Sequence, residues 1–552
     1  MNKVCLLCGL NSPKKMYMKN TIKVLLFCAS SFIAAQALAV VYQTADSTFG
    51  DIGKLIGANA FYERGIYGQG ANVANIELYA AWRDDEDWNN CMQYLEGASY
   101  NLYKPETTSQ AYAEHSYQTL GIMAGYNPNF ENQAMSTGLA YKASYTSAQI
   151  AEDSFFRSDK TELETYKLFF TNSTDVISSS WCDIKIPLTY KKGVVLDSYA
   201  YANPRTLLVG AAANDGAEGA NTVRSPFLNM NALKVGALDD STNFKTVASY
   251  SSYGPNHFYN PITKEVKESV VSAVDIVAPG TVYTVTESKG TMNIQGTSFA
   301  TPIVSSVAAL IHSYSVDKEM LSDSRDARLI KAVLMNSADK IAGWDNGSKR
   351  ETVRVGDVDY ANVLSTKQAL DFKSGAGALN AEAALQAYDQ FGTTSFLESV
   401  EFENSSYFDF HTDLTQFEFS ATLCWYIGTV VDNVTYTETT IAMSTIHQIN
   451  EVSADNSYFA NLDLRLWQFD GESYVLLAES VSEYNNVEHI FMELSEAGDY
   501  RLEVAFSEML YGTTPNETFA LAYNLAQIPE SSDCAAIFGA LALWFAVYYR
   551  RR

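Results

Sequence analysis

Residues 296–302 of this 552-residue chain read GTSFATP, and they run directly into the apolar segment IVSSVAALI at 303–311. The apolar run predicts a buried helix, and Pro302 fits its first turn, where a missing amide hydrogen does little harm. Ser298 therefore stands at a helix N-terminus, where backbone N–H groups and the positive end of the helix dipole can stabilise an oxyanion. The same position suits an ordinary serine N-cap. Other motifs in the chain are therefore needed to distinguish a nucleophile from an N-cap.

Residues 48–390 alternate short β-branched or apolar runs with helical patterns, which is typical of an α/β fold. Strands that are buried on both faces of a parallel sheet read as continuous apolar runs of this kind. We therefore predict one buried parallel sheet flanked by helices. Five of its strands are expected at Val73–Leu78, Asp175–Ser180, Thr206–Ala212, Leu233–Leu238 and Val274–Val277.

From residue 396 to residue 527 the hydrophobic pattern has a period of two. Every second residue from Phe417 to Trp425 is apolar, and the same alternation returns in three later segments. Turn pairs such as Asp470-Gly471 punctuate these segments. The pattern predicts a second domain over 396–527, an antiparallel β-sandwich that follows the α/β domain.

The heptapeptide around Ser298 resembles the nucleophile motif of the subtilisin-like serine peptidases. This resemblance implies that an acid, a histidine and an oxyanion-stabilising asparagine precede the serine, in that order along the chain. It also implies a subtilisin-like parallel sheet over residues 48–390, an endopeptidase activity and a protein or peptide substrate. Three candidates occur in the required order, which favours the nucleophile over the N-cap.

The histidine candidate is His115, which opens the segment HSYQTLGIMAG at 115–125. The family usually shows His-Gly-Thr-His here, followed by small residues on a buried helix. The first histidine matches, whereas Ser116, Tyr117 and Gln118 depart from that pattern. A histidine taken alone has many structural roles, but its place in the ordered set predicts a general base toward Ser298 and then a general acid toward the leaving amine.

The asparagine candidate is Asn214 in VGAAANDG at 209–216, directly after a predicted strand. The segment resembles the one that carries the family's oxyanion asparagine, although Ala213 replaces the usual glycine. A strand-capping turn is the structural alternative for Asn-Asp-Gly. Upstream, DVISSSW resembles the strand that lines the substrate cleft, where Ser180 and Trp181 would bind the substrate backbone and wall the P1 pocket.

The acid candidate departs from the family. Where relatives carry an aspartate after a strand of the form VAVID, this chain has NVANIELY at 72–79 and hence Glu77. A glutamate can accept the imidazole N–H and stabilise the imidazolium, so a Ser-His-Glu triad is chemically sound. Two alternatives stay open. Either one of Asp84, Asp85 and Asp87 serves instead, or Glu77 fills the position without orienting the histidine.

Two functions therefore compete at this stage. The first is an exported serine endopeptidase that uses Ser298, His115, Glu77 and Asn214. The second is a catalytically inactive subtilisin-like protein on the cell surface, in which the β-sandwich binds a partner. The glutamate, Gln118 and Ala213 favour the second function. A complete serine, histidine and asparagine set favours the first.

Both ends of the chain resemble targeting signals. Residues 1–39 resemble a signal peptide, with four lysines between positions 14 and 23, an apolar run from Val24 to Ala35 and the small residues Ala37-Leu38-Ala39. Residues 528–552 combine Ile528-Pro529-Glu530-Ser531, a short apolar stretch and three terminal arginines. This order resembles the PEP-CTERM sorting tail of Gram-negative bacteria, although a plain membrane anchor is an alternative. The resemblance implies export to the periplasm, outer surface or medium, brief membrane contact and a sorting enzyme as partner.

Charge and cysteine content limit the remaining possibilities. The chain has 38 basic and 64 acidic residues, a net charge of −26, which repels phosphate backbones and excludes nucleic acid as a natural partner. Only Cys91, Cys182 and Cys424 lie between the predicted signal peptide and the tail, so neither a disulfide framework nor a zinc site is predicted. No cofactor is predicted, although calcium sites are common in the resembled family and the surplus of acidic residues leaves a calcium site open; the sequence has no EF-hand-like loop.

Overall fold

The computed structural model describes residues 49–81, 100–103, 114–125, 138–153, 156–183, 190–285, 291–441 and 444–528. By their contacts, these described residues form one compact unit. The predicted signal peptide lies outside the described residues, and so does the predicted sorting tail after Ile528.

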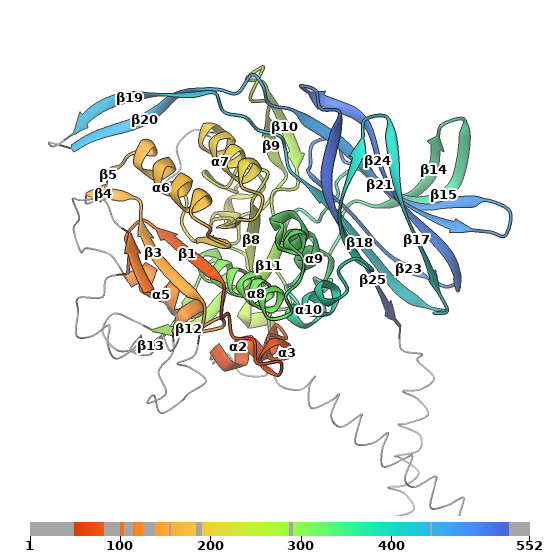
Figure 1. Cartoon of the computed structure of the whole chain (residues 1–552), viewed down its shortest axis with the longest axis horizontal. Coiled ribbons are helices and arrows are strands. Elements are labelled where there is room, and N and C mark those ends of the chain that lie inside the picture. Colours follow the sequence, from red (N-terminus) through yellow and green to blue (C-terminus); the bar gives the residue numbers. More distant parts are fainter. Residues whose placement is uncertain are drawn as a thin grey trace, which may run out of the picture. The chain divides into compact units, whose positions relative to one another are not determined.

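Seven strands form the central sheet, and every neighbouring pair is parallel (Figure 1). In spatial order they are β11 (Ile276–Pro279), β8 (Leu233–Leu238), β7 (Leu207–Ala211), β6 (Val176–Ser179), β1 (Asn72–Glu77), β3 (Ser144–Gln149) and β2 (Tyr100–Tyr103). The five predicted strands are all present, with ends within two residues of those expected. The other two strands carry mostly polar or tyrosine side chains, so no apolar run announces them.

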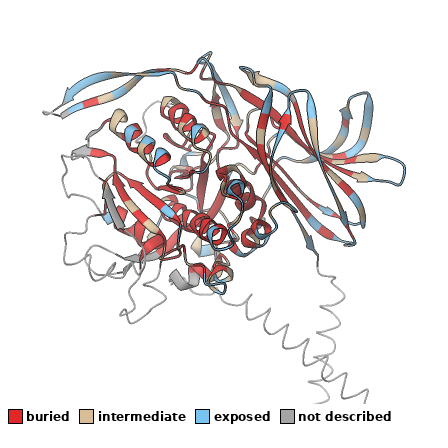
Figure 2. Cartoon of the chain, in the orientation of Figure 1, coloured by how far each residue is buried: buried red, intermediate tan, exposed pale blue. Residues whose placement is uncertain are grey.

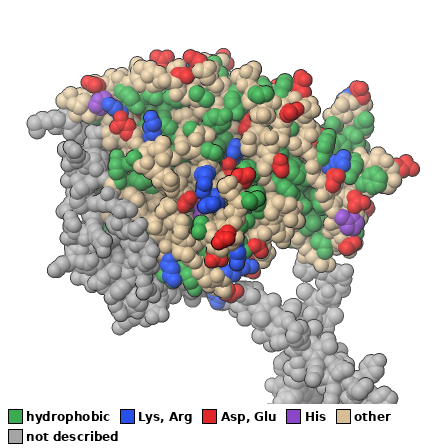
Figure 3. Space-filling model, viewed as in Figure 1, with side chains coloured by type: hydrophobic (Ala, Val, Ile, Leu, Met, Phe, Trp, Pro, Cys, Tyr) green, Lys and Arg blue, Asp and Glu red, His purple; other side chains and the backbone are tan. Residues whose placement is uncertain are grey.

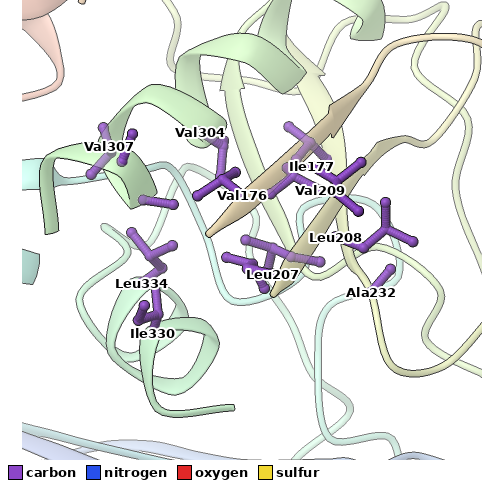
Figure 4. Packing of buried hydrophobic residues seen from close by; sticks show 14 of the residues in the cluster. Val176, Ile177, Leu207, Leu208, Val209, Ala232, Val304, Val307, Ile330 and Leu334 are labelled. Atoms are coloured by element: carbon purple, nitrogen blue, oxygen red, sulfur yellow. The ribbon is translucent and has the colours of Figure 1, made fainter. Parts of the chain in front are cut away.

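Helix α8 (Thr297–Asp317) is the centre of the core and packs against β6, β7, β8 and β11. Its side chains Val304 and Val307 face the sheet residues Val176 and Leu207, with α9 beside them (Figure 4). By length and composition α8 could cross a membrane, but it is buried here as a core helix. The other α-helices of the described residues are α2 (Phe49–Leu55), α3 (Asn59–Tyr62), α5 (Glu114–Ala124), α6 (Asp159–Thr171), α7 (Tyr190–Ala202), α9 (Ala327–Asn336) and α10 (Ala381–Asp389).

Two further sheets follow, and they share a second hydrophobic core. The four-stranded sheet contains β16 (Ser395–Glu401), β25 (Asn516–Gln527), β18 (Phe417–Trp425) and β23 (Val487–Leu494). The six-stranded sheet contains β14 (Lys349–Val355), β15 (Val358–Thr366), β22 (Tyr474–Ser480), β21 (Phe459–Phe469), β24 (Gly498–Tyr511) and β17 (Asn404–Thr412). The predicted antiparallel β-rich region after the parallel sheet is therefore confirmed.

The period-two pattern predicted these strands because every second side chain points to the face on which the two sheets pack together. Phe417, Phe419 and Leu423 of β18 are buried, and so are Leu462 and Leu464 of β21. One pairing was not expected, since β14 and β15 precede residue 390 and yet join the later sheet through a parallel pairing of β15 with β22. The exact division into 48–390 and 396–527 stays a prediction.

Four two-stranded ribbons complete the described strands. They are β4 (Ala151–Asp153) with β5 (Phe156–Arg157), β9 (Asn256–Tyr259) with β10 (Val266–Val271), β12 (Thr281–Val285) with β13 (Thr291–Gln295), and β19 (Asn433–Ile441) with β20 (Ser444–Ser453). Helix α9 joins the two halves of the fold, because it packs against β7 of the parallel sheet and also against β18 and β25. On the face shown in Figure 3, lysine and arginine side chains are scattered among neutral and acidic ones.

Candidate active site

The predicted site residues gather where the strands of the parallel sheet end. Strand β1 ends at Glu77, β6 ends one residue before Ser180, and β7 ends three residues before Asn214. Ser298 is the second residue of α8, which packs against the same strands. Ligand sites of open α/β sheets lie at this carboxyl edge, so the fold itself places these four residues in a functional position.

Glu77 and His115 form a direct pair. Nδ1 of His115 lies 3.2 Å from Oε2 of Glu77, and the glutamate side chain is only 2% exposed while the imidazole remains 40% exposed. The other carboxylate oxygen accepts a hydrogen bond of 3.0 Å from Oγ1 of Thr119, one helical turn beyond His115 on α5. The longer glutamate side chain therefore reaches the imidazole with both of its oxygens held.

Thr119 was not among the predicted residues, although the sequence carries a signal for it. Positions i and i+4 of a helix share a face, so Thr119 belongs on the side of α5 that presents His115. Its hydroxyl also accepts a 3.2 Å hydrogen bond from Nδ2 of Asn75, which lies on β1. Thr119 thus ties the helix that carries the histidine to the strand that carries the glutamate.

The Glu77 carboxylate changes the acidity of His115. Burial by itself disfavours the imidazolium, but the negative charge of Glu77 and its hydrogen bond outweigh that effect and raise the pKa of His115 above its ordinary value of 6.5. The same contact favours the tautomer with hydrogen on Nδ1, which leaves Nε2 free to accept a proton. This is the state that a general base requires.

Ser298 is half-buried at the start of α8, and its hydroxyl donates a 2.9 Å hydrogen bond to the carbonyl oxygen of Ser180. A carbonyl can only accept, so in this rotamer the serine proton points away from His115, and no hydrogen bond joins these two described residues. The imidazole ring lies beside the next residue, Phe299, with the ring centres 5.6 Å apart. The hydroxyl must therefore leave the Ser180 carbonyl before its proton can pass to the histidine.

Asn214 is held in one orientation at the entrance of α8. Its Oδ1 accepts hydrogen bonds from the backbone N–H of Thr297, at 2.9 Å, and from Oγ1 of Thr297, at 3.1 Å. Since the oxygen is occupied, Nδ2 points the other way, and it lies 3.4 Å from where a Cβ on Gly296 would stand. The φ of Gly296 is +155°, so this residue supplies both the conformation and the space that the amide needs.

The residue before Asn214 is strained. Ala213 has φ +91°, in a region that favours glycine, and it stands where the resembled family has glycine. We expect Ala213→Gly to raise the free energy of unfolding by about 1 kcal/mol, because the methyl group no longer opposes this conformation. Urea denaturation measures the change. The neighbouring Ala212→Gly is the control, since Ala212 is fully buried and has no positive φ, and it should destabilise the fold; equal effects would contradict the strain argument.

Trp181 is buried next to Ser180, and its Nε1 donates a 3.1 Å hydrogen bond to the hydroxyl of Tyr166 on α6. This bond fixes Trp181 one residue after Ser180, whose carbonyl accepts from Ser298, and its role in a P1 pocket stays a prediction. Directly after Asn214, the carboxylate of Asp215 forms an ion pair with Arg224.

Other candidates gave no further site. Asp84, Asp85 and Asp87 lie outside the described residues, and so does Cys91. Cys182 and Cys424 form no disulfide bond with each other in the described part of the chain. Among the residues that the structure describes, no group of three or more His, Cys, Asp or Glu side chains could hold a metal ion.

Comparisons with known proteins show similarity to serine proteases over part of the chain. The chain is 32% identical over 155 residues to thermitase of Thermoactinomyces vulgaris. This match covers 27% of this chain and 44% of thermitase. It is 26% identical over 253 residues to the thermostable alkaline protease of Halalkalibacterium halodurans, covering 46% of this chain and 59% of that protein. Each match thus spans less than two thirds of the relative's length.

Among solved structures, the prenylagaramide maturation protease PagA matches with a TM-score of 0.42 and 20% identity, over 60% of this chain and 97% of that one. A family model described as the subtilase family matches residues 65–377, which is more than half of the chain. The protein therefore belongs to the subtilase family of serine peptidases.

Proposed function

We propose that the protein is an exported serine endopeptidase that works through a Ser-His-Glu variant of the subtilisin triad. The observation that carries the proposal is the 3.2 Å contact of Glu77 with Nδ1 of His115, on the same sheet edge as Ser298 and Asn214. Family membership alone would be compatible with an inactive relative. The paired acid and histidine supply what an activated serine needs.

In the proposed reaction, Ser298 Oγ attacks the carbonyl carbon of a peptide bond while Nε2 of His115 takes its proton. Nδ2 of Asn214 and the backbone N–H of Ser298 hold the resulting oxyanion; that N–H lies in the first turn of α8, where no intrahelical acceptor exists. His115 then protonates the leaving amine, and water hydrolyses the acyl-enzyme by the same steps. Glu77 stays ionised and stabilises the imidazolium.

Covalent labelling tests the proposal without knowledge of the substrate. A fluorophosphonate reacts with a serine only when the serine is activated, and mass spectrometry of the purified protein then locates the adduct. We expect one label per chain, on Ser298. Well-folded protein that takes up no label would contradict the peptidase proposal.

The pH dependence of hydrolysis provides a second check. His115 must be unprotonated to accept the serine proton, and its pKa is raised above 6.5. The neutral fraction therefore falls as the pH drops through that raised value. We expect the acid limb of the kcat/KM profile to have its midpoint above pH 6.5. A limb centred clearly below that value would mean that Glu77 does not act on His115.

The oxyanion contact predicts a defined loss for Asn214. The variant Asn214→Asp keeps an oxygen that can accept from Thr297 but removes the Nδ2 donor, so the start of α8 should stay capped. We expect kcat to fall by at least about 10²-fold, with a melting temperature close to that of the wild type. Steady-state kinetics and thermal unfolding measure the two effects. A variant with unchanged kcat would remove Asn214 from the mechanism.

A second candidate function is a retired scaffold that binds a partner through its β-rich region. The observation in its favour is the Ser298 hydroxyl, which donates to Ser180 rather than to His115. Under this alternative, a binding or cell-surface phenotype survives Ser298→Ala unchanged. Under the peptidase proposal, the phenotype is lost.

Export is proposed from the two terminal segments. The lysine-rich apolar leader ending at Ala39 supports a cleaved signal peptide, and the tail from Ile528 to Arg552 supports PEP-CTERM-like sorting in a Gram-negative bacterium. Mass spectrometry of the protein from cell fractions tests both. We expect a mature chain that begins near Val40 and lacks the arginine-terminated tail, whereas an intact tail in the membrane fraction would favour the plain anchor.

A further inference from the structure

The hairpin formed by β19 and β20, which we call the arm, leaves the β-rich region and runs over the peptidase half of the molecule. It passes across α6 and α7 and reaches β5 (Figure 1). Its outer face is largely exposed (Figure 2). On the inner face Val452 is buried in the core of the peptidase half, and Val434 and Ile449 pack against that core. The arm is therefore docked on the two helices.

The tip of the arm binds the first residues of α6. The backbone N–H of His447 donates to Oγ of Ser158 at 3.3 Å, and the N–H of Ile449 donates to Oδ2 of Asp159 at 2.9 Å. Ser158 is the N-cap residue of α6, yet it makes no side-chain hydrogen bond to its own helix. Both polar side chains at this helix end are thus directed at the arm, which comes from almost 300 residues further along the chain.

Asp159 connects the arm to a buried ion cluster. Its second oxygen, Oδ1, lies 2.9 Å from Nζ of Lys192. That ammonium group also contacts Glu162, at 2.8 Å, and Asp183, at 3.0 Å, and the lysine side chain is only 5% exposed. Breaking one contact of a buried ionic cluster leaves charge without compensation, which is costly. A displacement of Asp159 is therefore transmitted to Lys192.

Lys192 in turn contacts the segment 180–183, which adjoins the nucleophile and which we call the wall segment. Asp183 lies three residues after Ser180, whose carbonyl accepts the hydrogen bond from Ser298. The ammonium group of Lys192 also lies 5.9 Å from the ring centre of Trp181. A continuous series of contacts hence runs from the arm through Asp159 and Lys192 to the segment 180–183.

We propose that the arm is a positioning element of the peptidase cleft, which holds the wall segment 180–183 in place through Asp159 and Lys192. The inference rests on the proposed peptidase function for its kinetic consequence, because the wall then binds the substrate. In this arrangement the β-rich region is part of the catalytic unit. Substrate binding depends on the docked arm, whereas activation of Ser298 by His115 does not.

The variant Ile449→Pro tests this in the full chain. The Ile449 N–H points out of the hairpin toward Asp159, so proline removes that bond and spares the pairing with β19. The matched control is Glu438→Pro. Glu438 faces His447 across the ladder, and since the His447 N–H also points outward, the Glu438 N–H points away from β20 on the free edge.

For Ile449→Pro we expect KM for a peptide substrate to rise at least about five-fold, with kcat and the rate of fluorophosphonate labelling within about two-fold of the wild type. Asp159→Asn, which weakens the contact with Lys192, should give a similar rise, and the double variant should be less than additive. Glu438→Pro should leave all values unchanged. An unchanged KM in Ile449→Pro would overturn the proposal.

Hydrogen exchange of the backbone amides in 180–183 supplies a measurement that needs no activity. In Ile449→Pro these amides should exchange faster than in the wild type and in Glu438→Pro. If the wild type neither labels nor cleaves, the peptidase function fails while faster exchange still supports coupling between the arm and the wall. Unchanged exchange overturns the coupling whatever the activity is.

Discussion

Replacing Ser298 with alanine is expected to abolish fluorophosphonate labelling and to lower kcat for peptide hydrolysis by about 10⁶-fold. The loss is this large because His115 and Glu77 have no proton to transfer once the hydroxyl is gone, so the triad fails as a unit. The fold should survive. The hydroxyl makes a hydrogen bond to the Ser180 carbonyl, and losing it costs about 1 kcal/mol.

A serine elsewhere in the same helix supplies the matched control. Ser305 of α8 is buried and donates a 3.0 Å hydrogen bond to the carbonyl of Thr301. Ser305→Ala therefore removes one hydroxyl and its hydrogen bond to a backbone carbonyl, as Ser298→Ala does. Because Ser305 lies further along the helix, away from the cleft, kcat should stay within about three-fold of the wild type. Residual hydrolysis in Ser298→Ala close to the wild-type rate would place the nucleophile elsewhere.

The architecture could be predicted from the sequence because its strongest signals are local. Apolar runs such as Leu233–Leu238 indicate a parallel sheet without any partner being known, and β8 occupies the same residues. Strand β3 was missed since its Ser and Thr residues carry no apolar signal, although it pairs with the whole of β1. The pairing of β15 with β22 is set by contacts between segments more than 100 residues apart, which periodicity cannot detect.

The site was predictable to the level of residue type and order, and less so in its contacts. Order along the chain singled out Ser298, His115 and Asn214, but rotamers decide what each side chain binds. The hydrogen bonds from Ser298 to Ser180 and from Thr119 to Glu77 depend on side-chain rotamers in this way, so the sequence could not predict them. The docking of the arm on α6 could not be predicted for another reason: backbone N–H groups donate its hydrogen bonds to Ser158 and Asp159, and such donors do not depend on residue type.

Glu77→Gln is expected to lower kcat by about 10⁴-fold while the protein stays folded. Glutamine has the same length as glutamate, so the side chain can still reach His115 and Thr119. It can, however, present an amide N–H₂ group to Nδ1, which favours the tautomer with hydrogen on Nε2 and removes the acceptor that Ser298 needs. The neutral amide also fails to stabilise the imidazolium in the transition state.

The His115 resonance separates this explanation from a general disturbance of the site. Because Glu77 is what raises the pKa of His115, the NMR titration of that histidine should move to lower pH in Glu77→Gln and should not move in Ser305→Ala. Glu77→Asp is the second comparison, since it keeps the charge and shortens the side chain by one methylene. We expect an intermediate loss of about 10²-fold, because the 3.2 Å contact lengthens unless α5 shifts. If Glu77→Gln retains hydrolysis within about ten-fold of the wild type, the acid is another residue, and Asp84, Asp85 and Asp87 become the positions to replace.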